Sequence, residues 1–175
     1  AAVQLAANAG ARVFATAGTD EKVQQCLDLG ADVAINYNDA DFAEIVLAET
    51  GNRGVDVVFD NVGEAVMEKS MACTAYNGRY VMMGFASNKT VADEPFIVPR
   101  RLCLGNFKLC GVLLSYADDD RVQMMKSALG WNVTPVEKGV QITADVCGLV
   151  RSGAVNPVVG SVVGFEDLPS PVDDL

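Results

Sequence analysis

Residues 54–63 read Gly-Val-Asp-Val-Val-Phe-Asp-Asn-Val-Gly, and this stretch decides the fold. Val55 to Phe59 is a short, largely apolar run, typical of a strand buried on both faces of a parallel sheet. Asp60, Asn61 and Gly63 then close the run at a turn. Because ligands of open α/β sheets bind at the carboxyl ends of the strands, these residues mark one side of a candidate site.

The segments on either side of this run alternate between strands and helices. Glycines end many of them, and Thr19 or Asp20, and Asp39 or Asp41, stand where helix N-caps are needed. The alternation predicts an α/β fold with a right-handed, mostly parallel sheet. We expect strands over 12–17, 33–35, 55–59, 79–83, 108–114 and 158–163, helices over 1–9, 19–29, 41–50, 65–74, 118–130 and 138–152, a turn at 77–78 and an irregular segment over 95–104.

The expected first helix, residues 1–9, has no strand or glycine-rich phosphate loop before it in the sequence. In a doubly wound sheet of strand order 3-2-1-4-5-6 that strand is central. We therefore expect either that the 175 residues belong to a longer chain or that the gap is filled in another way. Because pyrophosphate binds at such a loop, we also expect these residues alone to bind a dinucleotide weakly.

Composition excludes several classes of partner. The chain has 23 acidic and 13 basic residues and a formal charge of −10, which argues against nucleic acid and anionic membranes. No apolar run approaches the roughly 20 residues that a membrane span needs. We expect an acidic, soluble domain with a small-molecule substrate.

Cysteine and histidine usage limits the chemistry. The five cysteines are scattered singly among apolar neighbours, which indicates buried free thiols and a reducing, cytoplasmic location. The absence of histidine removes imidazole-based catalysis and metal ligation from this segment. The acidic run Asp118 to Asp120 is interpreted as the start of a helix, and no metal is expected.

Five segments together resemble a known family: residues 11–22, 29–37, 54–63, 78–87 and 157–160. They are similar to the cofactor-binding half of the medium-chain dehydrogenase/reductase superfamily, in its zinc-free, quinone oxidoreductase-like branch. The resemblance implies a Rossmann-type doubly wound sheet that lacks its first strand and glycine-rich loop. It also implies a dinucleotide-binding domain over residues 1–163, with 164–175 starting the return to a catalytic domain that is not present.

The resemblance places the adenosine ribose against Gly18. No acid stands at Ala17 or Gly18 to favour a 2′-hydroxyl, whereas Lys22 and Tyr37 match positions that contact a 2′-phosphate, so NADP is expected over NAD. The alternative is that Lys22 is a solvated helix residue and Tyr37 only packs. The nicotinamide side is expected at the ends of later strands: Asn61, Gly63, Gly84, Phe85, Ala86, Gly111, Val112 and Leu113. Asp60 is interpreted as structural, and Tyr116 as a packing residue.

The resemblance implies an NADPH-dependent reductase of quinones or activated alkenes, with catalytic residues that this segment does not identify. Two alternatives remain: an enoyl- or acryloyl-thioester reductase module, and a non-catalytic nucleotide-binding or interaction domain. The apolar segment 108–114 is expected to be an edge strand that forms a homodimer. In the alternative, the helix over 118–130 covers this edge.

Overall fold

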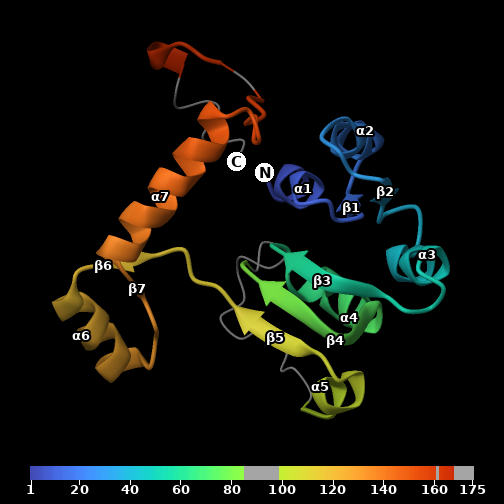
Figure 1. Cartoon of the computed structure of the whole chain (residues 1–175), viewed down its shortest axis with the longest axis horizontal. Coiled ribbons are helices and arrows are strands. Elements are labelled where there is room, and N and C mark those ends of the chain that lie inside the picture. The colour runs from blue at the N-terminus through green and yellow to red at the C-terminus, as the bar shows by residue number, and fades with distance from the viewer. Residues whose placement is uncertain (85–98, 161, 168–175) are drawn as a thin grey trace.

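The computed structural model describes residues 1–84, 99–160 and 162–167 (Figure 1). Within these ranges, no helix has the length and apolar character needed to cross a membrane. The elements in chain order are α1 (Ala2–Asn8), β1 (Phe14–Ala17), α2 (Asp20–Asp28), β2 (Val33–Asn36), α3 (Phe42–Glu49), β3 (Val55–Asp60), α4 (Glu64–Ala72), β4 (Thr74–Met82), α5 (Pro99–Gly105), β5 (Lys108–Gly111), β6 (Tyr116–Ala117), α6 (Asp119–Leu129), β7 (Thr134–Pro135), α7 (Val136–Arg151) and a 3₁₀ turn (Phe165–Asp167).

Every strand pair in the described ranges is parallel, which confirms the predicted α/β class. The strands form three sheets, β1-β2, β3-β4-β5 and β6-β7, rather than one continuous sheet. In Figure 1 the β1-β2 pair and the β3-β4-β5 sheet lie apart, with α3 in the segment that connects β2 to β3. A doubly wound order requires a strand between β1 and β3, and no described residue supplies one.

Helices cover both faces of the β1-β2 pair. Side chains along each strand alternate between two apolar clusters, as a period of two requires. Ala15 and Ala34 contribute to the cluster with α1 and α2, whereas Phe14, Val33 and Ile35 contribute to the cluster with α3. This alternation explains why the segment reads as continuously apolar, and it is the doubly wound arrangement that the sequence predicts.

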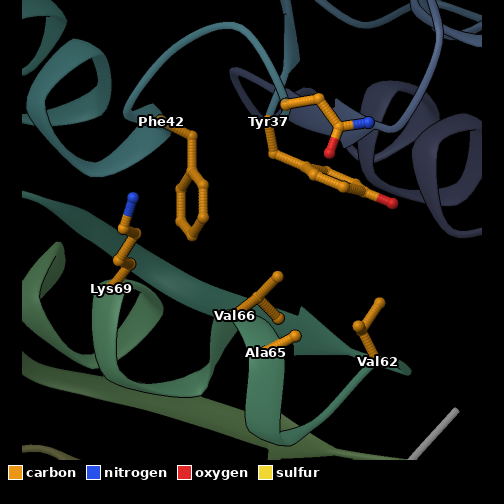
Figure 2. A pocket seen from close by; sticks show the side chains of 7 residues that line it. Tyr37, Phe42, Val62, Ala65, Val66 and Lys69 are labelled. Atoms are coloured by element: carbon orange, nitrogen blue, oxygen red, sulfur yellow. The ribbon is translucent and has the colours of Figure 1, made fainter. Parts of the chain in front are cut away.

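The helix α3 connects the two larger sheets through its buried face. Phe42 and Val46 of α3 are buried in one cluster with Cys73, and Val55 and Val66 pack against that cluster. Figure 2 shows Phe42 pointing from α3 towards α4, where Val66 lies. Burying side chains of this size contributes about 1.5–3 kcal/mol each, so this cluster is the main apolar contact between the β1-β2 pair and the β3-β4-β5 sheet.

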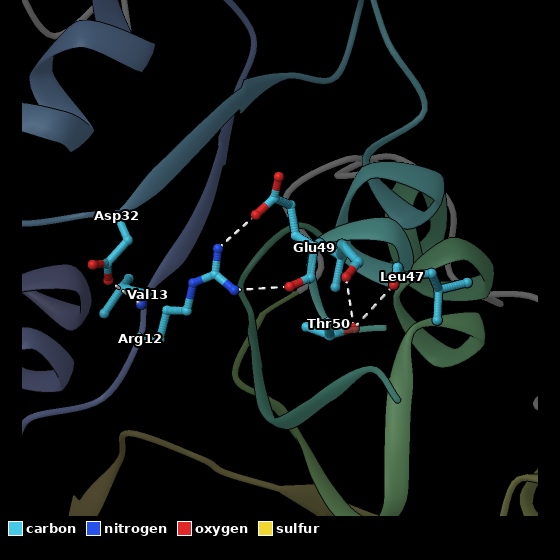
Figure 3. Close-up of polar contacts among 7 residues, drawn as sticks. Arg12, Val13, Asp32, Leu47, Glu49 and Thr50 are labelled. Atoms are coloured by element: carbon cyan, nitrogen blue, oxygen red, sulfur yellow. Dashed lines mark hydrogen bonds and ion pairs between the residues drawn. The ribbon is translucent and has the colours of Figure 1, made fainter. Parts of the chain in front are cut away.

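At the carboxyl end of α3, polar contacts connect the helix to Arg12, which lies just before β1 (Figure 3). The Arg12 guanidinium donates to the main-chain oxygen of Glu49 at 2.8 Å and to its carboxylate at 2.6 Å. It also lies over the Phe14 ring, 4.9 Å from the ring centre. A cation at the last carbonyls of a helix satisfies unpaired acceptors and the helix dipole, so Arg12 acts as a C-cap from another element.

The predicted helix starts are confirmed by their capping contacts. The side chains of Thr19, Asp41 and Asp118 accept hydrogen bonds from the main-chain nitrogens of Lys22, Ala43 and Arg121, at 3.3, 2.9 and 2.9 Å. Of the two acids proposed for α3, Asp41 is therefore the cap. The run beginning at Asp118 caps and opens α6, as expected from its sequence.

Two predicted strand boundaries were wrong. The turn expected at residues 77–78 lies inside β4, where Asn77 has a φ of 64° and the pairing with β3 jumps from Thr74 to Arg79. Asn77 tolerates this left-handed conformation and its main-chain nitrogen bonds the Asn106 oxygen at 2.8 Å. The strand expected over 108–114 ends at Gly111, although the nitrogen of Val112 still donates to the Met82 oxygen at 2.9 Å.

The last predicted strand is not formed. The described residues 158–160 and 162–163 adopt no strand, and Val159 and Val162 are 70% and 89% exposed. A strand requires a neighbour to bond, and none lies beside this segment in the described ranges. Conversely, the short parallel pair β6-β7 was not predicted, because a strand of two residues is too short to show an alternating pattern of apolar and polar side chains. The expected irregular segment 95–104 lies partly outside the described residues, and its remainder enters α5.

The cysteines are free thiols, as expected, but they are not uniformly buried. Cys73 is buried in the cluster under α3, and Cys26 and Cys110 are half-buried. Cys103 and Cys147 are exposed on α5 and α7, which corrects the expectation for these two. Their apolar neighbours lie on helix surfaces that the described residues leave uncovered.

Candidate functional site at the carboxyl ends of the strands

The first half of the site is the paired ends of β1 and β2. The nitrogen of Tyr37 donates to the Ala17 oxygen at 3.1 Å, and the Asn38 side-chain amide donates to the Gly18 oxygen at 2.8 Å. A Cβ placed on Gly18 would lie 2.7 Å from the Tyr37 hydroxyl. The structure therefore brings Gly18 and Tyr37 into contact, and a side chain at position 18 would displace this hydroxyl. Lys22 lies close in sequence, in the first turn of α2.

The second half is formed by the ends of β3 and β4. The nitrogen of Met83 donates to the Asp60 oxygen at 2.8 Å, which sets the two strand ends side by side. A Cβ on Gly84 would lie 2.9 Å from the Asn61 main-chain oxygen, and still closer to its side-chain oxygen. Gly63 has a φ of 84° and precedes α4. The structure thus brings Asn61 and Gly84 into contact, with Gly63 two residues after Asn61; their role in cofactor binding stays a prediction.

A buried carboxylate holds this turn in place. Asp60 accepts hydrogen bonds from the nitrogens of Val62 and Gly63 at 2.7 and 3.0 Å through one oxygen, and from the Tyr80 hydroxyl through the other. Tyr80 is completely buried, and this burial together with the Asp60 contact raises the pKa of Tyr80 far above its ordinary value. Tyr80 is therefore a neutral donor at every physiological pH. The predicted structural role of Asp60 is confirmed.

The end of β5 is only partly described at the site. Gly111 ends the strand, and Val112 and Leu113 follow it with exposed side chains. Phe85 and Ala86, also predicted for the nicotinamide side, lie outside the described residues. Tyr116 packs its ring against Gly139 of α7 and therefore has the packing role expected of it.

A cavity of about 520 Å³ lies between the two halves. Figure 2 shows Tyr37 and Phe42 on one side of it and the helix α4 on the other. Lys69 of α4 forms an ion pair with Asp41 at 2.9 Å, and this contact lowers the pKa of the Asp41 carboxyl. The volume falls in the range of small-molecule sites, which are commonly concave and largely apolar. The lining residues are Tyr37, Asn38, Phe42, Val62, Ala65, Val66 and Lys69.

Of these lining residues, sequence reasoning identified only Tyr37. A signal for the others exists, because Ala65, Val66 and Lys69 fall three and four residues apart and so share one helical face. This face of α4 lies opposite α3 across the cavity. That arrangement depends on how α3 packs, and a local sequence pattern cannot show it. The described residues contain no group of three or more cysteine, aspartate or glutamate side chains placed to hold a metal ion.

The chain matches a family model described as zinc-binding dehydrogenase over residues 1–131. A 2-haloacrylate reductase from a Burkholderia species is 42% identical over 96 residues, which are 55% of this chain and 28% of that protein. A highly reducing polyketide synthase from Leptosphaeria maculans is 39% identical over 87 residues, which are 48% of this chain and 3% of that protein.

Solved structures agree with these sequence matches. Escherichia coli quinone oxidoreductase, crystallised in complex with NADPH, superposes with a TM-score of 0.66 and 26% identity, over 91% of this chain and 43% of that one. The chain belongs to the medium-chain dehydrogenase/reductase superfamily. It corresponds to the cofactor-binding domain, and it spans less than half the length of each of these three relatives.

The arrangement suits binding and orientation of a dinucleotide by this domain. The described strand ends offer main-chain groups, the Asn61 amide, the Tyr37 hydroxyl and the Lys22 ammonium. These groups donate hydrogen bonds or neutralise phosphate.

Replacing Tyr80 by phenylalanine is expected to destabilise the domain. The change leaves one oxygen of buried Asp60 without its donor, which costs about 1–3 kcal/mol. Urea unfolding measures the free energy of unfolding. The matched control is Tyr76→Phe, because Tyr76 lies on the same strand but is 78% exposed. Equal stability of the two variants would contradict a structural role for the Asp60–Tyr80 contact.

Replacing Gly84 by alanine is expected to push Asn61 out of place. The added Cβ meets a main-chain oxygen that cannot move freely, and overpacking of this kind costs about 1–3 kcal/mol. Gly111→Ala is the control on the adjacent strand, since a Cβ there meets nothing within 4 Å. Thermal unfolding should show a lowered midpoint for Gly84→Ala only; a loss of similar size in both variants would rule out the close approach of Asn61.

Proposed function

We propose that the chain binds NADPH within a zinc-independent reductase that acts on quinones or other activated alkenes. The observation that carries the proposal is the contact of the Tyr37 hydroxyl with Gly18, together with Lys22 in the first turn of α2 and the lack of an acid at Ala17 or Gly18. The nicotinamide supplies the hydride, and the residues of this chain bind and orient the cofactor. Complexes of similar proteins with NADPH support the same cofactor.

A 2′-phosphate requires cations and hydroxyl donors where a 2′-hydroxyl prefers an acceptor. Tyr37 provides a hydroxyl at the surface of Gly18, and Lys22 provides an ammonium on the adjoining first turn of α2. The amino end of a helix adds a favourable field for an anion. These groups support selection of NADPH over NADH.

The cavity beside Tyr37 suits the adenine ring of the same molecule. Its walls combine an aromatic ring, aliphatic side chains from α4 and the amide of Asn38. A flat heteroaromatic ring gains from stacking and apolar contact, and its edge requires hydrogen-bonding groups. The proximity of this cavity to Gly18 supports one continuous binding surface across both sheets.

A thioester reductase is the second candidate function. The similarity to a highly reducing polyketide synthase supports it. Both candidates use the same cofactor site. Turnover assays on a quinone and on an enoyl thioester, with NADPH as the donor, distinguish them.

Replacing Lys22 by alanine in the full-length protein is expected to weaken NADPH binding by roughly 10- to 100-fold, because a charge-assisted phosphate contact is worth about 1.5–3 kcal/mol. NADH binding should change little. Fluorescence titration with each cofactor measures both constants. Lys138→Ala, an exposed lysine on α7, is the control. Equal losses for the two cofactors would remove Lys22 from the phosphate site.

We also propose a homodimer formed through the edge of β5. This strand is the outer member of the β3-β4-β5 sheet, and α6 packs against β7. Leu109 and Leu113 are exposed along the edge. An uncovered strand edge pairs readily with a second copy, and pairing across a two-fold axis uses the same edge twice.

Backbone geometry provides a test of the dimer. Main-chain groups alternate sides along a strand, and the Val112 nitrogen already donates to β4, so the Leu109 nitrogen should face outwards. Leu109→Pro is expected to give a monomer that keeps the hydrogen bonds between β4 and β5. Val112→Pro should instead break the bond to Met82 and have a lower melting temperature than Leu109→Pro. Light scattering that finds wild-type monomer, or a dimer in Leu109→Pro, would exclude the proposal.

A further inference from the structure

Asn36 is the last residue of β2 and immediately precedes Tyr37. Its side-chain nitrogen donates to the carboxylates of Asp20 and Asp39, at 2.9 and 2.6 Å. Its side-chain oxygen accepts from the nitrogen of Asn38 at 3.1 Å. An asparagine side chain has two N–H donors, and here each one holds a different carboxylate.

The two carboxylates flank the proposed phosphate position. Asp20 opens α2, two residues after Gly18 and two before Lys22, and Asp39 follows Tyr37 by two residues. All of these residues lie at the end of the β1-β2 pair, where Ala17 is in register with Asn36. A carboxylate at this end can pair with the Lys22 ammonium, repel a phosphate, or accept from a ribose hydroxyl.

We propose that Asn36 is a positioning residue that determines cofactor selectivity by restraining both carboxylates. Held by one amide, Asp20 and Asp39 do not compete with phosphate for Lys22 and do not serve as acceptors for a 2′-hydroxyl. This role rests on the proposed NADPH function. It explains how a strand end bordered by two acids selects the cofactor with the additional negative charge.

Two substitutions separate this role from simple support of the turn. Asn36→Asp keeps an acceptor for the Asn38 nitrogen but removes both N–H donors and adds a charge. Asn36→Leu removes the donors without adding charge. If the restraint matters, both variants shift selectivity in the same direction, towards NADH. If only the added charge matters, Asn36→Leu leaves the ratio unchanged.

The measurement is the ratio of kcat/KM for NADPH to that for NADH in the full-length protein. We expect the ratio to fall roughly threefold to tenfold in both variants, because exposed charges are partly screened. The matched control is Gln24→Glu on α2, whose side-chain amide donates to the Asp28 carboxylate at 2.9 Å. That change has the same chemistry and charge but lies outside the strand end, so its ratio should match wild type.

A rescue variant completes the test. Asn36→Asp combined with Asp20→Asn restores an amide–carboxylate pair with the partners exchanged, and should return the ratio towards wild type. Equal losses for both cofactors, or an unchanged ratio in Asn36→Leu, would overturn the role of Asn36. A wild-type protein without NADPH preference would instead overturn the proposed function, so the two failures are distinguishable.

Discussion

The apolar cluster beneath α3 is the contact on which the arrangement of the site depends. Among the described residues, no strand lies between β1 and β3. Phe42 and Val46 connect the two sheets by packing with Cys73, and Arg12 anchors the far end of the same helix (Figure 3). Phe42 of the same helix also lines the cavity, so the packing of α3 contributes to its shape.

Polar side-chain contacts give each half of the site its local precision. In the β3-β4-β5 sheet, the Asp60 carboxylate organises the turn through three donors, one of which comes from the neighbouring strand. In the β1-β2 pair, the Asn36 amide performs the equivalent task with both of its polar atoms. In both halves, a polar side chain at a strand end orders the groups that face the ligand.

Sequence reasoning succeeded where the cause is local. Caps such as Thr19 and Asp41 act within three residues, and the alternation of strands and helices follows from side-chain periodicity. It failed where an element depends on a distant partner. The valine-rich segment from Val158 has strand-like composition but no neighbouring strand in the described ranges, and the β6-β7 pair exists only because two distant dipeptides meet.

The sequence by itself determined the α/β fold class and the helix caps, and it predicted which strand ends form the site. These depend on periodicity, turn chemistry and the sterics of single residues. Only the tertiary structure decided that Tyr80 meets Asp60, that Phe42 faces α4, and that Asn36 holds Asp20 from another element. Each of these contacts joins residues that lie far apart in the chain, and its geometry is set by the packing of whole helices and strands.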